Sequence, residues 1–159
     1  MGIVVRPVVE TDLAVLRQRE DRPGAELVDR HFEAAATGGL LFAAAFDGDA
    51  VLGTALLDLN AEAMTPELRN MFVFPEARRR GAGRALSRWI EDQARAAGFT
   101  AVYLAVDPNN ERAVPLYISL EYHPTGEHLF VEQPEVVQVD DNDRVSSYYA
   151  IYKKSLTIR

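Results

Sequence analysis

The hydrophobic and polar positions of the chain switch repeatedly between a strand-like and a helix-like period. Runs of β-branched and other apolar residues predict strands at 3–6, 40–46, 51–59, 67–74, 100–106, 122–131 and 144–154. Apolar residues three and four positions apart predict one helix that begins near Asp12 and three further helices over 25–37, 81–97 and 112–120. The resulting order, β-α-α-β-β-β-α-β-α-β-β, is typical of a layered α/β or α+β fold.

Turn residues mark the ends of several of these elements. Asp47-Gly48-Asp49 predicts a hairpin between the second and third strands, and Pro75 ends the fourth strand. The clearest helix is 81–97, because apolar residues share one of its faces and Gly98 follows it. These apolar residues are Leu86, Trp89, Ile90 and Ala94. If the strands on either side of this helix are parallel, the connection should be a right-handed crossover.

Length and composition predict one globular domain over residues 1–159, with 48% hydrophobic and 26% charged residues. The sequence has no cysteine, which excludes disulfides and thiolate chemistry and fits a reducing compartment. No apolar run approaches the roughly 20 residues of a membrane span, and the N-terminus lacks a signal-peptide pattern. We therefore expect a soluble, cytoplasmic protein without a membrane partner.

The formal net charge of −7 narrows the class of partner. Bulk electrostatics disfavour nucleic acid, because like charges repel, whereas an amine-bearing partner is accommodated more easily. The segment 121–143 holds seven acidic residues and no lysine or arginine. We interpret it either as a region that attracts a cationic amine or as a solvated acidic loop.

A turn rich in arginine and glycine lies between the fourth strand and the clearest helix. Residues 71–84 read MFVFPEARRRGAGR. The first N–H groups of a helix lack internal partners and carry partial positive charge, and Gly81 and Gly83 would let a ligand reach them. Arginines are unfavourable at a helix N-terminus unless an anion is bound there. The segment therefore predicts a phosphate or pyrophosphate cradle, and the alternative is simply a basic helix start.

Two common nucleotide motifs fit this turn poorly. A Walker A loop requires Gly-Lys-Ser/Thr, which the segment lacks, and a dinucleotide fingerprint requires a third glycine where Leu86 stands. Instead, Arg78-x-x-Gly81-x-Gly83 resembles the coenzyme A pyrophosphate loop of the GNAT superfamily of N-acetyltransferases. A second match follows the next strand, at the family's spacing for Asn110, Ala113, Leu116 and Tyr117. The resemblance covers nearly the whole chain and is densest over 67–122.

The resemblance implies a fold and a cofactor. The expected fold is a mixed, mostly antiparallel central sheet with a parallel, splayed pair of strands, flanked by helices. The expected acetyl donor is acetyl-CoA, without a metal. The implied cofactor-binding residues are Met71, Phe72, Val73, Arg78, Arg79, Arg80, Gly81, Ala82, Gly83, Arg84 and Asn110. Backbone amides of 79–84 would hold the pyrophosphate, Met71 and Val73 would pair with the pantetheine arm like an added strand, and Asn110 would bond to that arm.

The resemblance also implies two catalytic residues. A free alkyl amine, with a pKa near ~10.4, must lose a proton before it attacks a thioester. Glu67 is the leading base, directly or through water, and Tyr117 is the candidate acid that protonates the departing thiolate. The N–H of Met71 is the candidate donor to the oxyanion. The alternatives are a surface Glu67 paired with Arg69, a core Tyr117, and an Asn110 that only caps a helix.

The sequence departs from the family pattern in one place, because Glu121-Tyr122 replaces the usual Gly-Phe pair, so that the backbone geometry there is in doubt. Pro115 inside a short helix is also expected to kink or shorten it. His31, His123 and His128 are too scattered to indicate a metal site, and His31 fits a core or pocket-edge position.

The function favoured by the sequence is an N-acetyltransferase that moves an acetyl group from acetyl-CoA to a primary amine through a tetrahedral intermediate. The acceptor could be a small molecule or a protein, and cationic amines fit the net charge. Alternatives are a non-catalytic acyl-CoA-binding or sensing module and a nucleotide-binding regulatory domain. A homodimer is compatible with the resemblance, because GNAT relatives are often dimers.

Overall fold

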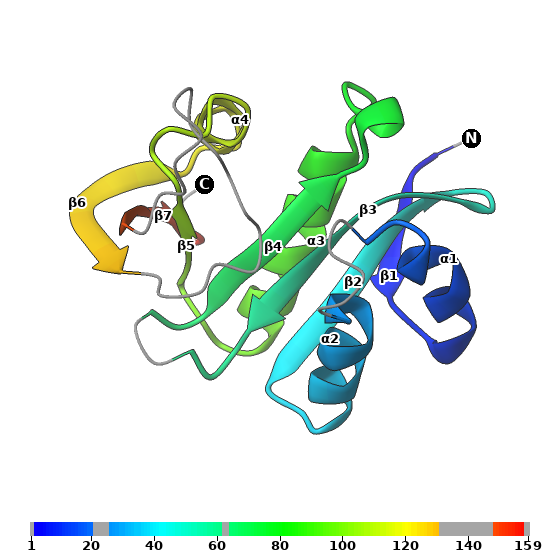
Figure 1. Ribbon diagram of the computed structural model, residues 1–159. Helices are drawn as coiled ribbons and strands as arrows, with labels where there is room; N and C mark the ends of the chain where they lie inside the picture. The colour runs from blue at the N-terminus through cyan, green and yellow to red at the C-terminus, as the bar shows by residue number, and fades with distance from the viewer. Residues whose placement is uncertain (1, 21–25, 62–63, 131–147, 158–159) are drawn as a thin grey trace.

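The structure is a computed structural model that describes residues 2–20, 26–61, 64–130 and 148–157. Its strands form one sheet in the order β1-β2-β3-β4-β5-β7-β6 (Figure 1). They are β1 (Val4–Pro7), β2 (Leu40–Asp47), β3 (Ala50–Asp58), β4 (Glu67–Val73), β5 (Ala101–Val106), β6 (His123–Phe130) and β7 (Tyr148–Ser155). Neighbouring strands are antiparallel except β4 and β5, which are parallel.

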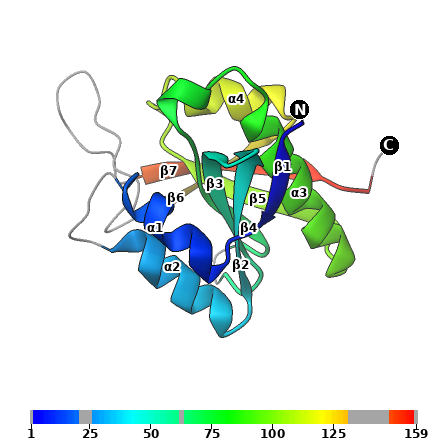
Figure 2. The same cartoon turned by 90° about the vertical axis from the view of Figure 1, so that its right-hand side faces the viewer.

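Helices cover both faces of this sheet (Figures 1 and 2). The helices α1 (Leu13–Arg17), which follows the 3-10 turn η1 (Glu10–Asp12), and α2 (Leu27–Ala36) lie on one face. The helix α3 (Ala82–Ala96) lies on the other face and follows the short 3-10 turn η3 (Pro75–Ala77). The helix α4 (Ala113–Ser119) lies beyond the ends of β4 and β5. In the part of the chain that the structure describes, no helix is long and apolar enough to cross a membrane.

The core consists of two clusters, one on each face of the sheet. Leu86, Ile90 and Ala94 of α3 are fully buried against one face, as their helical spacing predicts. Phe42 and Leu56 belong to the second cluster, under α1 and α2. Burying a leucine or isoleucine side chain contributes roughly 1.5–3 kcal/mol, so α3 is held firmly to the sheet and its N-terminus has a fixed position.

The parallel strands β4 and β5 pair only where they begin. Among the described residues, the register pairs Glu67 with Tyr103 alone, and the N–H of Tyr103 donates to the carbonyl oxygen of Pro66 at 3.0 Å. Beyond this point no further register pairs join the two strands in the described chain. The sheet is therefore split between two neighbouring strands, which is the splayed pair that the resemblance implies.

A β-bulge in β4 lies beside this split. Leu56 of β3 pairs with Arg69, and Thr54 pairs with Phe72, so β4 has one residue more than β3 between these two pairs. Asn70, within the bulge, has a left-handed φ of 53°, a region that asparagine enters more readily than most residues. The bulge removes Asn70 and Met71 from regular pairing with β3 and changes the edge that β4 presents to the split.

The structure confirms the predicted order of elements, with bounds that differ by one or two residues at most ends. Residues 144–147 of the last predicted strand, and positions 25 and 131, lie outside the described residues. The hairpin at 47–49 is confirmed, because Asp47 pairs with Ala50. Pro115 does not interrupt α4. It stands in the first turn, where N–H groups have no intrahelical partner in any case. Glu121 has a φ of 74°, so the position where the family prefers glycine is indeed left-handed here.

Candidate active site

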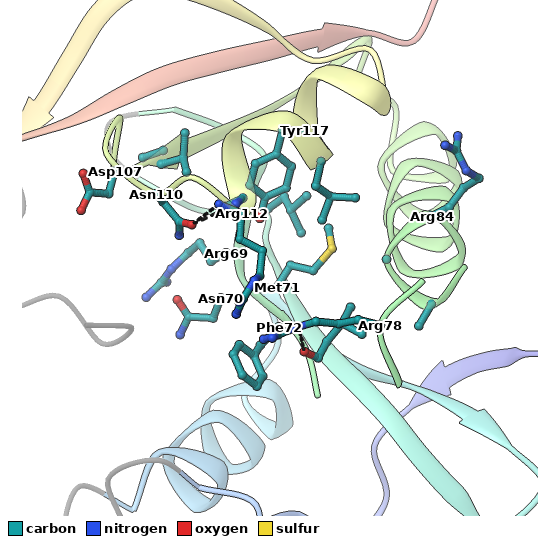
Figure 3. A pocket seen from close by; sticks show the side chains of 18 of the residues that line it. Arg69, Asn70, Met71, Phe72, Arg78, Arg84, Asp107, Asn110, Arg112 and Tyr117 are labelled. Carbon is teal, nitrogen blue, oxygen red and sulfur yellow. Dashed lines mark hydrogen bonds between the residues drawn. The ribbon is translucent and has the colours of Figure 1, made fainter. Parts of the chain in front are cut away.

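The split between β4 and β5 forms a cleft of about 790 Å³ (Figure 3). Its walls come from β4, from the end of β5 with α4, and from the turn that begins α3. Most of the predicted site residues line it: Glu67, Met71, Phe72, Val73, Arg78, Arg79, Gly81, Ala82, Gly83, Arg84, Asn110 and Tyr117. The structure thus brings together segments that are far apart in the sequence.

The remaining predicted residue, Arg80, does not line the cleft. Its guanidinium forms an ion pair with Asp47, at the end of β2. The three consecutive arginines therefore have different surroundings, although the sequence gives no sign of the difference.

The start of α3 offers backbone N–H groups at one end of the cleft. Arg79 and Gly81 have left-handed φ values of 67° and 91°, and the helix begins after Gly81. The N–H of Ala85 donates to the carbonyl oxygen of Gly81 at 3.0 Å, so the N–H groups of the three preceding helical residues have no intrahelical acceptor. A Cβ placed on Gly81 would meet nothing within 4 Å. An anion could therefore approach these groups.

Gly83 has a different local role. A Cβ there would meet the Leu116 side chain at 3.5 Å and the Val73 side chain at 3.7 Å. Gly83 thus lies where α3 packs against β4 and α4, and its lack of a side chain allows this close packing next to the cleft.

The arginines around this turn differ in their availability. Arg78 donates through Nε to the carbonyl oxygen of Val73 at 3.1 Å and lies 5.5 Å from the centre of the Phe72 ring. Burial, followed by the nearby charge of Arg112, lowers the pKa of Arg78. Arg79 and Arg84 are exposed and have no ion pair within the described part of the chain. Figure 3 shows the Arg84 side chain pointing away from the other labelled residues.

The edge of β4 supplies further hydrogen-bonding groups. The N–H of Phe74 donates to Leu52 of β3 at 2.9 Å. Because the backbone groups of successive residues point to opposite edges, those of Val73 point away from β3, toward the cleft. The contact between Arg78 Nε and the Val73 oxygen agrees with this direction. Met71, next to the bulge, lines the cleft as well.

Glu67 is a half-buried carboxylate at the closed end of the split, where β4 begins. Burial raises the pKa of Glu67 from 4.5 to about 7; the charge of Arg69 lowers it and that of Asp58 raises it. Arg69 is paired with Asp58 at 3.0 Å rather than with Glu67, so the expected alternative, a surface glutamate bound to Arg69, is not what the structure shows. A carboxyl with a pKa near 7 can accept and release a proton at neutral pH.

Tyr117 is a buried tyrosine of α4 whose ring lines the cleft. It packs edge to face with Tyr122, with ring centres 6.1 Å apart, and is 8% exposed. Burial raises the pKa of Tyr117 to about 12, so that its hydroxyl keeps the proton at neutral pH. Tyr117 therefore packs in the core and also lines the cleft, so the two alternatives that the sequence offers for this side chain do not exclude each other.

Asn110 caps the start of α4. Its Oδ1 accepts hydrogen bonds from the N–H groups of Arg112 at 3.1 Å and Ala113 at 2.9 Å. The capping interpretation is therefore correct for the side-chain oxygen. The side chain also lines the cleft, so its amide nitrogen remains a candidate donor to a ligand.

Several cleft residues were missed by the sequence reasoning, namely Arg69, Asn70, Asp107, Arg112 and Tyr149. Asp107 immediately follows β5, and a polar residue at a strand end next to a split was the signal that could have found it. His31 lies at the edge of the site, because its ring packs on Phe42 at 5.7 Å and its Nε2 is 3.5 Å from Asn70. Residues 131–143 of the acidic segment lie outside the described residues.

Metal chemistry has no obvious ligand set here. Within the described ranges, no group of three or more His, Cys, Asp or Glu side chains could hold a metal ion.

Comparison with known proteins gives a family match. The profile of the Acetyltransferase (GNAT) family matches residues 10–122. The "IAA acetyltransferase" of Azospirillum brasilense is 33% identical over 93 residues, which cover 53% of this chain and 61% of that protein. The match therefore spans about three fifths of that relative's length.

Solved structures resemble this chain over nearly its full length. An N-acetyltransferase from Staphylococcus aureus has a TM-score of 0.74 and 16% identity, over 99% of this chain and 100% of that one. YncA from Salmonella typhimurium, solved with its cofactor acetyl-CoA, has a TM-score of 0.72 and 17% identity, over 100% of this chain and 96% of that one. At such identities the likeness shows the shared fold.

Proposed function

Because the chain belongs to the GNAT acetyltransferase family, we propose that it is an N-acetyltransferase that moves an acetyl group from acetyl-CoA to a primary amine. The observation that carries this proposal is the composition of one cleft. Glu67, Tyr117 and the open N-terminus of α3 all line it. A proton acceptor, a proton donor and an anion cradle beside one split sheet are the parts that acyl transfer from a phosphate-bearing thioester requires.

The residues around α3 would bind the donor. The N–H groups of Ala82, Gly83 and Arg84 are the ones without intrahelical acceptors, and they would hold the pyrophosphate. The exposed guanidinium of Arg79 would add long-range attraction. When bound, acetyl-CoA supplies the acetyl group as an activated thioester.

The edge of β4 would hold the pantetheine arm as an added strand. This pairing uses the backbone groups of Val73, whose oxygen accepts a hydrogen bond from Arg78 Nε and has a second lone pair for the arm. The amide nitrogen of Asn110 would bond to the arm from the opposite wall. The N–H of Met71 would donate to the carbonyl oxygen of the acetyl group as that oxygen becomes negative.

Two side chains would move the protons. Glu67, with its pKa near 7, would accept the proton of the ammonium group, directly or through water. The amine nitrogen then bonds to the acetyl carbon, and the bond between carbon and sulfur breaks. Tyr117 would give its proton to the departing sulfur, which suits a hydroxyl whose raised pKa keeps it protonated until then. The attacking nitrogen would lose its second proton as the amide forms, and that proton would restore the Tyr117 hydroxyl.

A panel of primary amines, each mixed with the protein and acetyl-CoA, tests this function. We expect release of free coenzyme A thiol that depends on the amine, with the acetylated amine identified by mass spectrometry. The protein has no cysteine, so it contributes no thiol background. If the protein binds acetyl-CoA but no small or protein amine causes release of the coenzyme A thiol, the result would instead support an acyl-CoA-binding module.

A further inference from the structure

Asp107 is a buried carboxylate that has no cationic partner in the described part of the chain. It is 3% exposed and lines the cleft at the end of β5. Its Oδ1 accepts a hydrogen bond from the N–H of Asn109 at 2.9 Å. No side chain of the described residues forms an ion pair with it, and none donates a hydrogen bond to Oδ2.

The other buried carboxylates of the described chain are paired. Asp12 binds Arg6 at 2.9 Å, and Glu91 binds Lys154 at 3.1 Å. Burying a carboxylate is unfavourable unless a cation or several hydrogen bonds compensate for the lost water. Within the described ranges Asp107 has one backbone hydrogen bond and no compensating cation.

The free oxygen of Asp107 is not fully enclosed by the described residues. Among the described residues, no fully enclosed side-chain nitrogen or oxygen lacks a hydrogen-bond partner. Because Oδ2 lacks a partner, it must be in contact with open space, and the space that Asp107 lines is the cleft. Figure 3 shows Asp107 at the opposite end of the labelled residues from Arg78 and Arg84, away from the proposed phosphate cradle.

Tyr149 of β7 lines the cleft as well. Burial and the negative charge of Asp107 together raise the pKa of its hydroxyl, which shows that the two side chains lie within electrostatic reach. Tyr149 adds an aromatic ring to the cleft that Asp107 also lines, and an aromatic ring together with a carboxylate suits a short hydrocarbon chain that ends in a cation.

We propose that Asp107 binds a second positive charge on the acceptor, so that the acceptor is a small molecule with a reacting amine and another cationic group. The inference rests on the proposed function of this cleft. The reacting amine must become neutral before it attacks, whereas a second ammonium keeps its charge throughout. A fixed buried carboxylate therefore suits the group that is not acetylated.

Equilibrium binding measures this property separately from catalysis. The probes are 1,4-diaminobutane, which carries two amines, and butylamine, which carries one, titrated by calorimetry in the presence of coenzyme A. We expect the protein to bind the diamine at least about tenfold more tightly than the monoamine, as a charge-assisted contact typically provides. Asp107→Asn should remove most of this preference and leave butylamine binding unchanged.

The variants are matched so that loss of fold does not confuse the result. Asp107→Asn keeps an oxygen that can accept from the N–H of Asn109, and Asp107→Glu keeps the charge and should keep the preference. Glu111→Gln is the control, because Glu111 is exposed and lies outside the cleft lining. This substitution removes the same unit of net charge as Asp107→Asn. It should change neither affinity. In steady-state assays the Asp107→Asn effect should fall on KM for the diamine rather than on kcat.

The outcomes separate this inference from the proposed function. If the protein acetylates amines without preferring the diamine, or if the preference survives in Asp107→Asn, the inferred role of Asp107 is wrong. The enzyme assignment would be unaffected by either result. Diamine binding that depends on Asp107, in a protein that neither binds acetyl-CoA nor releases thiol, would support the cation subsite and remove the enzyme assignment.

Discussion

The Glu67→Gln substitution should lower activity and raise stability, because the same half-buried carboxylate is the proposed base and destabilises the fold when ionised. Burial raises the pKa of Glu67 from 4.5 to about 7. Each pKa unit corresponds to 1.36 kcal/mol, so ionised Glu67 costs roughly 3 kcal/mol in the folded protein. The side chain is only half buried, and solvent screening reduces the expected measured cost to about 2 kcal/mol.

The sign of the pH dependence follows from proton binding. Well below pH 4.5 Glu67 is protonated in both the folded and the unfolded chain, so its burial has no ionic cost. Between 4.5 and about 7 the folded chain holds more protons than the unfolded chain, so this group makes stability fall as pH rises. Glutamine does not titrate. The stability advantage of Glu67→Gln over the natural chain should therefore grow by about 2 kcal/mol between pH 4.5 and pH 8.

Urea unfolding followed by circular dichroism at several pH values measures this difference. Glu33→Gln, on the exposed side of α2, is the matched control and should show no such growth with pH. In parallel, kcat/KM of the natural chain should rise with pH and level off above about 7, while Glu67→Gln should lose that dependence and about 10²–10⁴-fold in rate. If the stability difference between Glu67→Gln and the natural chain stays constant with pH, the raised pKa of Glu67 is refuted. If Glu67→Gln keeps the pH profile of kcat/KM of the natural chain, Glu67 is not the base.

The remaining predictions concern three other side chains. Tyr117→Phe should lower kcat by about 10²-fold while leaving the Kd for acetyl-CoA unchanged, and equal losses in both would count against the acid role. Glu121→Gly should stabilise the chain by about 1 kcal/mol in urea unfolding, because the φ of 74° at this position suits glycine; a loss of stability would show that the Glu121 side chain has a compensating contact. Lys154→Met should destabilise by about 3 kcal/mol, since it leaves Glu91 buried without its cation, and near-neutral stability would mean that Ser87 and Tyr122 suffice to hold Glu91.

Local sequence patterns predicted the elements well because local chemistry decides them. The periodicity of α3 and the glycine after it are sufficient to place that helix, and the turn at 47–49 is sufficient to place the hairpin. The strand order was not predicted from the pattern, because β7 inserts between β5 and β6 through pairings that connect distant parts of the chain. The splayed pair was expected only through the family resemblance.

The site was predictable to the extent that its residues belong to a motif. Tyr117 and the turn at α3 line one cleft, as the two motif matches suggested, and Glu67, which only the wider resemblance implied, lines it too. Arg80 illustrates what a motif does not specify, because its partner Asp47 belongs to a hairpin far away in sequence.

Asp107 illustrates the same limit for a residue outside the motif. Its position at the end of a strand marks it as a candidate, but its neighbours along the sequence do not distinguish it from an exposed aspartate in an Asp-Pro-Asn turn. Its burial depends on how the end of β5 packs with β7 and with the start of α4, which is a tertiary property.

The most direct test of the central claim is calorimetric titration of acetyl-CoA into the natural chain and into Gly81→Asn and Gly81→Asp. Both substitutions place a side chain of the same size at a left-handed position that these two residue types tolerate, and they differ only in charge. We expect the natural chain to bind, Gly81→Asn to bind somewhat more weakly, and Gly81→Asp to lose at least a further tenfold, because its carboxylate would repel the pyrophosphate. Equal affinities for the two variants, or no heat with the natural chain, would contradict a diphosphate cradle at the start of α3.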